Sequence, residues 1–169
     1  MSTLSLLLKN VVCLLILWAP MESAAQTSKL GRDVVALSTY IASQQFLEMG
    51  KTVDDPARVD SIYLRALQLT DNDISEALLT LVYATIPYNA MPVRLPLIDI
   101  TVTIPILSAS EEVFRAKNAN LPSRLFTDTP THEFGDKDKL AHFFGNAFLD
   151  YHSLFFDLSS AIGYFVEAF

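Results

Sequence analysis

Apolar residues recur at helical spacing in three stretches between residues 28 and 85. In the first stretch, Thr27-Ser28 offers a cap and Gly50 a left-handed stop, so we expect one helix between them. The second stretch begins at Asp54-Asp55-Pro56 and the third at Asp73-Ile74-Ser75-Glu76, and both are typical helix starts. The residues expected to face the core are Leu30, Val34, Leu37, Ile41 and Leu47 in the first helix, Val59, Ile62, Tyr63, Ala66 and Leu69 in the second, and Ile74, Ala77, Leu78, Leu81 and Val82 in the third.

The pattern changes after Ile86, where prolines at positions 87, 92, 96 and 105 exclude a helix. Between the last two prolines, residues 98–104 alternate apolar and polar without interruption, which predicts a half-buried strand. Only residues 91–95 lie near enough in the sequence to pair with this strand. We expect the strand to pack under the helices as an extended loop, because an exposed edge invites aggregation. Completion of the strand by another chain is the alternative.

Two further helices are predicted after this segment. Ser108-Ala109-Ser110-Glu111 has the spacing of a capping box and begins a short helix that runs to Lys117. A polar connection from Asn118 to Gly135 follows, and then a helix that Asp136 or Asp138 caps. We find no internal repeat and no domain boundary. The sequence therefore predicts a mainly α fold, with a single helical domain over residues 26–169 and one short extended segment over residues 97–104.

The composition describes a folded and acidic chain. Apolar residues make up 51% of the 169 residues and charged residues 18%, which excludes intrinsic disorder. The net charge is −7. A protein that binds nucleic acid needs basic residues to neutralise phosphates, so nucleic acid is excluded as a partner.

Residues 1–25 have the three parts of a secretory signal peptide. Lys9 precedes an apolar run over residues 11–19, and Ser23-Ala24-Ala25 supplies the small residues of a cleavage site before Gln26. We expect export and cleavage after Ala25. An uncleaved membrane anchor is the alternative, although the run is shorter than the ~20 residues that span a bilayer. A lipoprotein acylated at Cys13 is disfavoured, because Val12 stands where a small residue is usual.

Several kinds of active site are missing from the sequence. Cleavage removes Cys13, the only cysteine, and with it thiol catalysis and thiolate-bound metals. No Gly-x-Ser-x-Gly motif occurs, and the 5 glycines form no phosphate-binding loop. Two histidines four residues apart, the strong zinc spacing, are also absent, since His142 and His152 are further apart and His132-Glu133 lies in the preceding connection. We therefore expect no cofactor and no metal.

The last predicted helix carries a narrow polar stripe. Asp138, His142, Asn146 and Asp150 follow at four-residue intervals, each about 40° further around the helix axis, and Lys139 adjoins the first of them. The simpler interpretation is a helix face that only contacts water. Against it, nearly every other position is apolar, so we expect the helix to be buried on most sides and the stripe to face a cleft. These five residues are the candidate catalytic residues, because an aspartate–histidine pair can transfer protons.

The start of this helix, Asp138-Lys139-Leu140-Ala141-His142-Phe143 followed by Gly145, resembles the D-K-x-x-H-F signature of VanZ-like membrane proteins. It is also similar to a group of small, uncharacterised bacterial envelope proteins and lipoproteins with D-K-x-x-H at a helix start. Residues 162–167 are similar to a later stretch of the same group. The resemblance implies functional roles for Asp138, Lys139 and His142, and a location in the cell envelope. Unlike VanZ-like proteins, the chain has no clean membrane span, since residues 140–156 are too polar to face lipid.

Two functional interpretations follow. The favoured one is a non-enzymatic exported protein, peripheral to the membrane in the periplasm or cell envelope, whose amphipathic helices pack on a membrane surface or on another envelope protein. The alternative is a small envelope enzyme that uses Asp138 and His142 on a lipid-derived or cell-wall substrate. The apolar stripe that continues to Phe169 without a polar tail predicts that the chain is a fragment of a longer protein.

Overall fold

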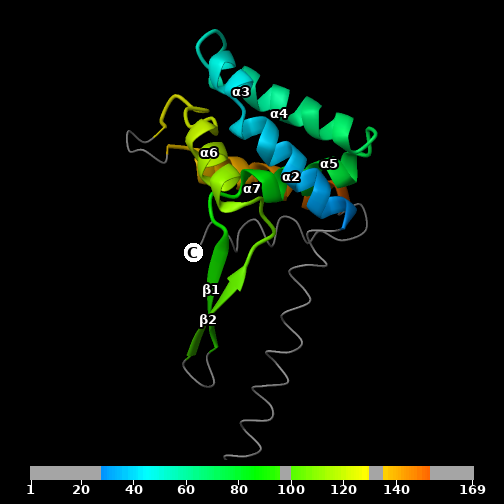
Figure 1. The fold of residues 1–169 in the computed structure, drawn as a ribbon, viewed down its shortest axis with the longest axis vertical. Helices are drawn as coiled ribbons and strands as arrows, with labels where there is room; N and C mark the ends of the chain where they lie inside the picture. Colours follow the sequence, from blue (N-terminus) through cyan, green and yellow to red (C-terminus); the bar gives the residue numbers. More distant parts are fainter. Residues whose placement is uncertain (1–27, 96–99, 130–134, 153–169) are drawn as a thin grey trace, which may run out of the picture.

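A computed structural model describes residues 28–95, 100–129 and 135–152, and these form six helices and one two-stranded hairpin (Figure 1). The mainly α prediction with one short extended segment is confirmed. The predicted signal peptide, His132-Glu133 and the stretch after His152 lie outside the described residues. The elements are α2 (Lys29–Ala42), α3 (Gln44–Met49), α4 (Asp55–Leu69), α5 (Ile74–Thr85), β1 (Ala90–Leu95), β2 (Ile100–Pro105), α6 (Glu111–Asn120) and α7 (Lys137–His152).

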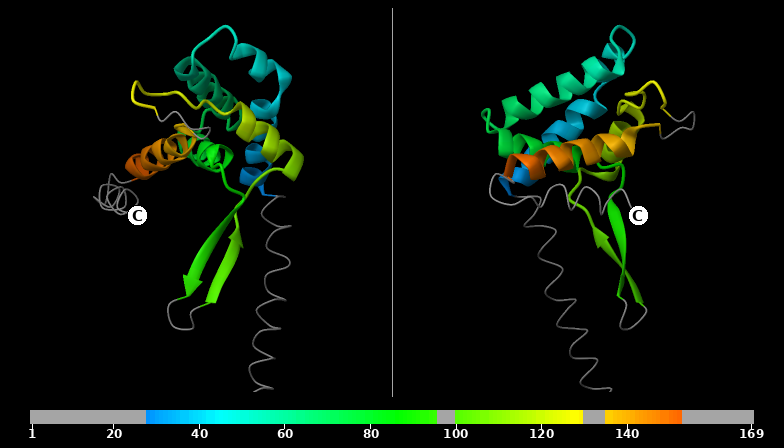
Figure 2. Two further views of the ribbon diagram at one scale, coloured as in Figure 1. Left: turned by 90° about the vertical axis from the view of Figure 1, so that its left-hand side faces the viewer. Right: turned by 180° about the vertical axis from the view of Figure 1, so that it is seen from behind.

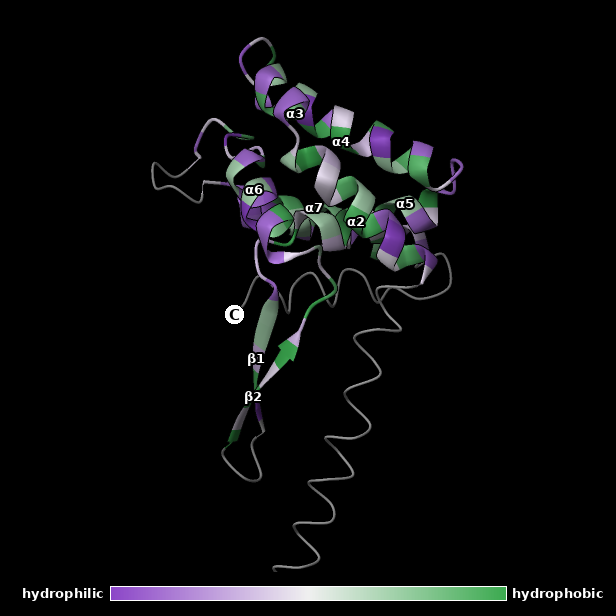
Figure 3. Ribbon diagram, viewed as in Figure 1, coloured by the Kyte–Doolittle hydropathy of each residue, from purple (hydrophilic) through white to green (hydrophobic). Residues whose placement is uncertain are grey.

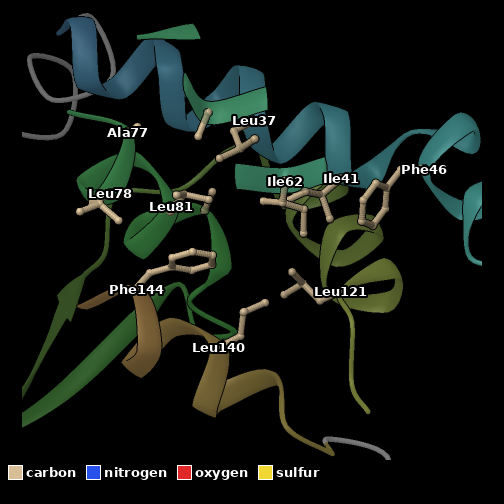
Figure 4. Close-up of a cluster of buried hydrophobic side chains, with 12 residues drawn as sticks. Leu37, Ile41, Phe46, Ile62, Ala77, Leu78, Leu81, Leu121, Leu140 and Phe144 are labelled. Carbon is tan, nitrogen blue, oxygen red and sulfur yellow. The ribbon is translucent and has the colours of Figure 1, made fainter. Parts of the chain in front are cut away.

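The hydrophobic core is built around α5, which packs against α2, α4 and α7. Ala77, Leu81 and Ala84 of this helix have no exposed surface. Figure 4 shows Leu81 between the side chains of α2 on one side and those of α7 on the other. The other members of this core are Leu37 and Ile41 of α2, Phe46 of α3, Ile62 and Ala66 of α4, Leu78 of α5, Leu121, and Leu140 and Phe144 of α7.

Three helix starts follow the predicted capping chemistry. Ser28 Oγ accepts a hydrogen bond from Gly31 N (2.9 Å), Asp54 Oδ1 from Ala57 N (3.0 Å) and Asp73 Oδ1 from Glu76 N (3.0 Å). Each cap satisfies a backbone N–H that has no partner within its helix. The periodic apolar residues of α2, α4 and α5 mostly face the core as predicted, but Ile74 is exposed.

The first predicted helix is in fact two. Ser43 has extended backbone angles (φ −70°, ψ 151°) between α2 and α3, and its side chain accepts a hydrogen bond from Phe46 N at 3.2 Å. This new start turns Phe46 into the core and leaves Leu47, a predicted core residue, exposed. Gly50 has φ −64°, so it is no left-handed stop.

The predicted capping box before α6 is not used. The helix begins at Glu111, with Ser110 rather than Ser108 before it, and continues past Lys117 to Asn120. Ala109 is buried ahead of the helix. Glu111 accepts hydrogen bonds from Asn89 Nδ2 (3.2 Å) and Arg115 Nε (2.8 Å).

The predicted strand pairs with the nearby segment of its own chain. β1 and β2 are antiparallel, with Met91 opposite Ile104 and Val93 opposite Val102. The expectation of a half-buried strand packed under the helices is wrong, because the hairpin projects from the helical body and only Val102 of β2 is partly buried (Figures 1 and 2). Pairing β1 with β2 closes only a short loop. Because the entropic cost of that loop is small, pairing within the chain is favoured.

One face of the hairpin is apolar. Because side chains alternate along a strand, Met91, Val93, Ile100, Val102 and Ile104 share this face. Met91 and Ile100 are each 52% exposed and Ile104 is 39% exposed. In Figure 3 the strands, which extend away from the helical body, carry green apolar segments between white and purple ones. We call these five residues the hairpin face.

Candidate functional site

The polar stripe lies on α7, which is less buried than the sequence predicted. Leu140 and Phe144 are in the core, but Phe143 is 61% exposed and Tyr151 is 49% exposed. The expectation of a helix buried on most sides is therefore wrong. Among the described helices and strands, α7 packs extensively only against α5, so only one strip of its surface is covered. The five candidate residues Asp138, Lys139, His142, Asn146 and Asp150 are all exposed.

The structure brings Asp138 and His142 to the edge of one apolar cavity. The cavity has a volume of about 420 Å³ and lies between α7 and the base of the hairpin. Ala141 of α7 lies in its wall between the two polar residues. The rest of the lining comes from the first half of β1 and from the chain just before and after the hairpin, namely Ile86, Pro87, Tyr88, Ala90, Met91, Pro92 and Ile106.

The other three candidates lie away from this cavity. Lys139 Nζ pairs with Asp136 Oδ1 at 3.0 Å, and its ammonium lies 5.5 Å from the ring centre of Phe126. Asn146 and Asp150 are further along α7 and do not line the cavity. His152, at the end of the helix, is bonded through Nε2 to Ser75 Oγ at 2.6 Å. Of the five candidate residues, only Asp138 and His142 therefore lie at the cavity.

Asp136 fixes the start of α7, and hence the polar edge of the cavity. Its Oδ2 accepts hydrogen bonds from Leu125 N (3.1 Å), Phe126 N (3.3 Å) and the hydroxyl of Thr129. Burial alone would raise the pKa of this carboxyl, but these bonds and Lys139 outweigh it and lower the pKa to about 2. The sequence suggested Asp136 only as a helix cap, whereas its side chain organises the loop that precedes the helix.

Gly135 allows the chain to enter this arrangement. It has φ +53°, a conformation that favours glycine, and a Cβ atom there would lie 2.1 Å from the carbonyl oxygen of Ser123. The next residue, Asp136, donates its N–H to that same oxygen at 3.0 Å. The close approach of the two backbone segments therefore requires a residue without a side chain.

The opposite wall of the cavity is held by α6. Lys117, which is 1% exposed, donates from Nζ to the carbonyl oxygens of Ala84 (2.7 Å) and Ile86 (2.6 Å). Asn118 donates to Pro87 O at 3.1 Å, and Lys137 of α7 donates to Asn118 O at 2.8 Å. Burial lowers the pKa of Lys117 to about 7. These contacts connect both walls to one helix, and no sequence motif indicated them.

A second buried polar group holds the far end of α6. Asp55 pairs with Arg58 (Oδ1 to Nη1, 2.8 Å) and accepts from Ser123 N and Arg124 N at 2.9 and 2.8 Å. Arg58 also donates to the carbonyl oxygen of Asn120. The sequence predicted Asp55 only as part of a helix start and gave Arg58 no role, because their partners outside α4 are more than 60 residues away.

The arrangement suits the binding of an apolar group with a polar end. A mostly apolar cavity with a few polar groups at its edge is the usual form of a small-molecule site. Within the described part of the chain, both polar residues at the cavity edge are exposed, and no hydrogen bond joins Asp138 to His142. No group of three or more metal-ligating side chains is found in that same part of the chain.

Comparison with known proteins finds no matching protein family, no similar curated protein and no similar solved structure. The likeness of residues 138–143 to envelope proteins therefore stays a prediction from a short motif. In residues 28–95, 100–129 and 135–152, no helix combines the length and apolar character needed to cross a bilayer.

Proposed function

We propose that the protein is a non-enzymatic, exported protein of the cell envelope that lies on a membrane surface and contacts it through the hairpin face. The observation that carries this proposal is the exposure of that face on a hairpin that projects from the helical body (Figure 1). A two-stranded hairpin is marginally stable alone in water, so an apolar contact would also stabilise the element itself. The signal-peptide pattern of residues 1–25 and the D-K-x-x-H motif support the location.

The size of the face fits a reversible contact. Fully burying an exposed side chain such as methionine or isoleucine gains about 1.5–3 kcal/mol. Met91, Ile100 and Ile104 are about half exposed, so covering all three gains on the order of 3 kcal/mol. Binding of this strength is weaker than that of a spanning helix and is typical of a peripheral protein.

The direction of the hairpin is consistent with this contact. The start of α2, where the described chain begins, lies at the same end of the helical body as the hairpin (Figures 1 and 2). A signal peptide is held in the membrane during export, so the hairpin would then extend on the membrane side. Because the net charge is −7, we expect apolar contact rather than attraction to anionic lipids to hold the protein there.

Fractionation of the tagged full-length protein tests this proposal. We expect the protein to sediment with membranes, to resist a high-salt wash and to be released by carbonate. Replacing two residues of the hairpin face, Ile100→Thr with Ile104→Thr, should lower the membrane partition coefficient about tenfold, because about 1.4 kcal/mol of apolar burial is lost. Threonine keeps the β-branched side chain that strands favour.

The matched control uses the other face of the same strand. Thr101→Ser with Thr103→Ser should leave the bound fraction unchanged, since these side chains point away from the hairpin face. N-terminal sequencing of the recovered protein should begin at Gln26, which shows that no leader holds it in the membrane. Retention of the Ile100/Ile104 variant at the wild-type level would contradict the proposed contact. Binding to native membranes but not to protein-free vesicles would show that the surface is another envelope protein.

A second candidate function is a small enzyme that acts on a lipid-derived or cell-wall molecule held in the cavity. The observation that favours it is the position of Asp138 and His142 together at the cavity edge. His142→Gln keeps a hydrogen-bonding side chain but cannot transfer a proton. If the protein is an enzyme of this kind, the variant should fail to complement a deletion strain at normal abundance. Under the non-enzymatic proposal, we expect full complementation.

A further inference from the structure

We infer that the cavity between α7 and the hairpin binds a primary aliphatic amine, with the hydrocarbon chain inside and the ammonium at Asp138. The inference does not rest on the membrane contact, because it concerns a ligand in solution and a cavity that shares only Met91 with the hairpin face. The first argument is the cavity itself. Its volume of about 420 Å³ is within the range of small-molecule sites, and its walls are formed mainly by apolar side chains from α7, β1 and the segments that flank the hairpin.

The second argument is the charge at its edge. Asp138 lies between two lysines in the sequence, yet both are engaged elsewhere: Lys137 Nζ donates to Asn118 O at 2.8 Å, and Lys139 Nζ pairs with Asp136 Oδ1 at 3.0 Å. Among the described residues no salt bridge joins a cation to the Asp138 carboxylate, although the nearby Lys139 ammonium interacts with it electrostatically. An anionic edge on an apolar cavity is complementary to a cationic head on an apolar chain, and it opposes a fatty acid.

The third argument concerns the geometry of the head group. An ammonium has three donors and no acceptor. His142 follows Asp138 by one helical turn on the same side of α7, and both line the cavity. The carboxylate can accept one hydrogen bond and a neutral imidazole nitrogen a second, while the third donor remains in water. An alcohol of the same length would fill the same cavity without the charge interaction.

The fourth argument is that the walls are held in place before any ligand arrives. Asp136 fixes the start of α7, and Lys117 and Asn118 fix residues 86 and 87 through hydrogen bonds to their carbonyl oxygens. Because these hydrogen bonds already order the walls of the cavity, little of the binding free energy is lost to ordering them when a ligand binds.

Titration calorimetry of the full chain with octylammonium, octanoate and 1-octanol at pH 7 tests the inference. We expect octylammonium to bind about tenfold more tightly than octanoate, with octanol between them. Asp138→Asn should remove the preference for the amine and leave the affinity for octanol unchanged. Asp150→Asn, on the same helix but outside the cavity, should bind all three molecules as the wild type does.

Two further variants test whether the cavity holds the chain. Ala141→Trp fills it from α7 and Ala90→Phe fills it from the hairpin, so the test does not depend on the folding of one variant. Either folded variant should lose binding of all three molecules. Equal affinities for the amine and the acid, an unchanged preference in Asp138→Asn, or undiminished binding in a filled variant would each overturn the inference. Absence of binding to the wild-type chain would overturn it as well.

Discussion

Replacing Asp136 by alanine is expected to lower the free energy of unfolding by about 3 kcal/mol, as for other buried polar groups whose partners lose their acceptor. The side chain has no exposed surface and accepts hydrogen bonds from two backbone N–H groups and the Thr129 hydroxyl. Its removal leaves Leu125 N without an acceptor and Lys139 without its partner, while Phe126 N and the Thr129 hydroxyl keep only the bonds between their own two residues. Urea denaturation followed by far-UV circular dichroism measures the change.

The same residue predicts a particular dependence on pH. The pKa of Asp136 is about 2 in the folded protein, against an ordinary value of 3.8 that applies to the unfolded chain. A depressed carboxyl pKa stabilises the folded state above the unfolded value, and that stabilisation is lost as the pH falls from about 4 to about 2. Asp136→Asn keeps an accepting oxygen but cannot titrate, so its stability relative to the wild type should improve over this window.

Asp138 provides the control for this prediction, since it is an exposed carboxylate only two residues away. Asp138→Asn should change the free energy of unfolding by less than about 0.5 kcal/mol. Equal effects of Asp136→Ala and Asp138→Asn would contradict the anchoring role of Asp136. So would parallel pH profiles for the wild type and Asp136→Asn between pH 2 and 4.

The elements that the sequence predicted well are those encoded by neighbouring residues. Asp54 and Asp73 cap helices because the N–H groups they bind lie three residues away. The break at Ser43 also has a local signal, a serine three residues before the Phe46 N–H that it binds. It was missed because the apolar spacing continues through it, and periodicity alone favours the longer helix.

The exposure of apolar residues could not be predicted in the same way. Periodicity shows which residues share a face of a helix, but not whether a neighbouring element covers that face. Phe143 and Phe144 are adjacent, yet one is mostly exposed and the other is buried, because α5 covers only one strip of α7. The hairpin follows the same rule: alternation predicted a strand with one apolar face, and only the tertiary structure shows that this face is exposed.

Only one half of the candidate site, the polar pair on α7, could be predicted from the sequence. Asp138 and His142 are four residues apart, so a helix places them on one side without further information. The apolar wall opposite them comes from residues 86–88, 90–92 and 106, and nothing in the sequence indicated that these residues lie opposite α7. The groups that hold the walls, such as Lys117 with Ala84 and Ile86, act over more than 30 residues, and such contacts follow from the fold rather than from spacing.

Lys117 carries the prediction with the largest expected effect. Lys117→Ala removes a buried side chain and leaves the Ala84 and Ile86 carbonyl oxygens without their donor, so we expect a loss of about 3–5 kcal/mol in the free energy of unfolding. Lys117→Met keeps most of the side-chain volume and removes a buried charge, so its loss should be smaller, about 1–2 kcal/mol. Lys51→Ala, at an exposed position, should cost less than about 0.5 kcal/mol.

The pH dependence distinguishes burial of the Lys117 charge from simple packing. The pKa of Lys117 is about 7 in the folded protein against an ordinary value of 10.5. Between these values the unfolded chain binds more protons than the folded chain, so this residue makes stability rise with pH from about 7 to about 10.5. Lys117→Met lacks this contribution, and its deficit relative to the wild type should therefore grow over the same window. A deficit that stays constant from pH 7 to pH 10 would show that the ammonium is no more costly to bury than to expose, and that Lys117 stabilises the fold through its hydrocarbon stem and hydrogen bonds alone.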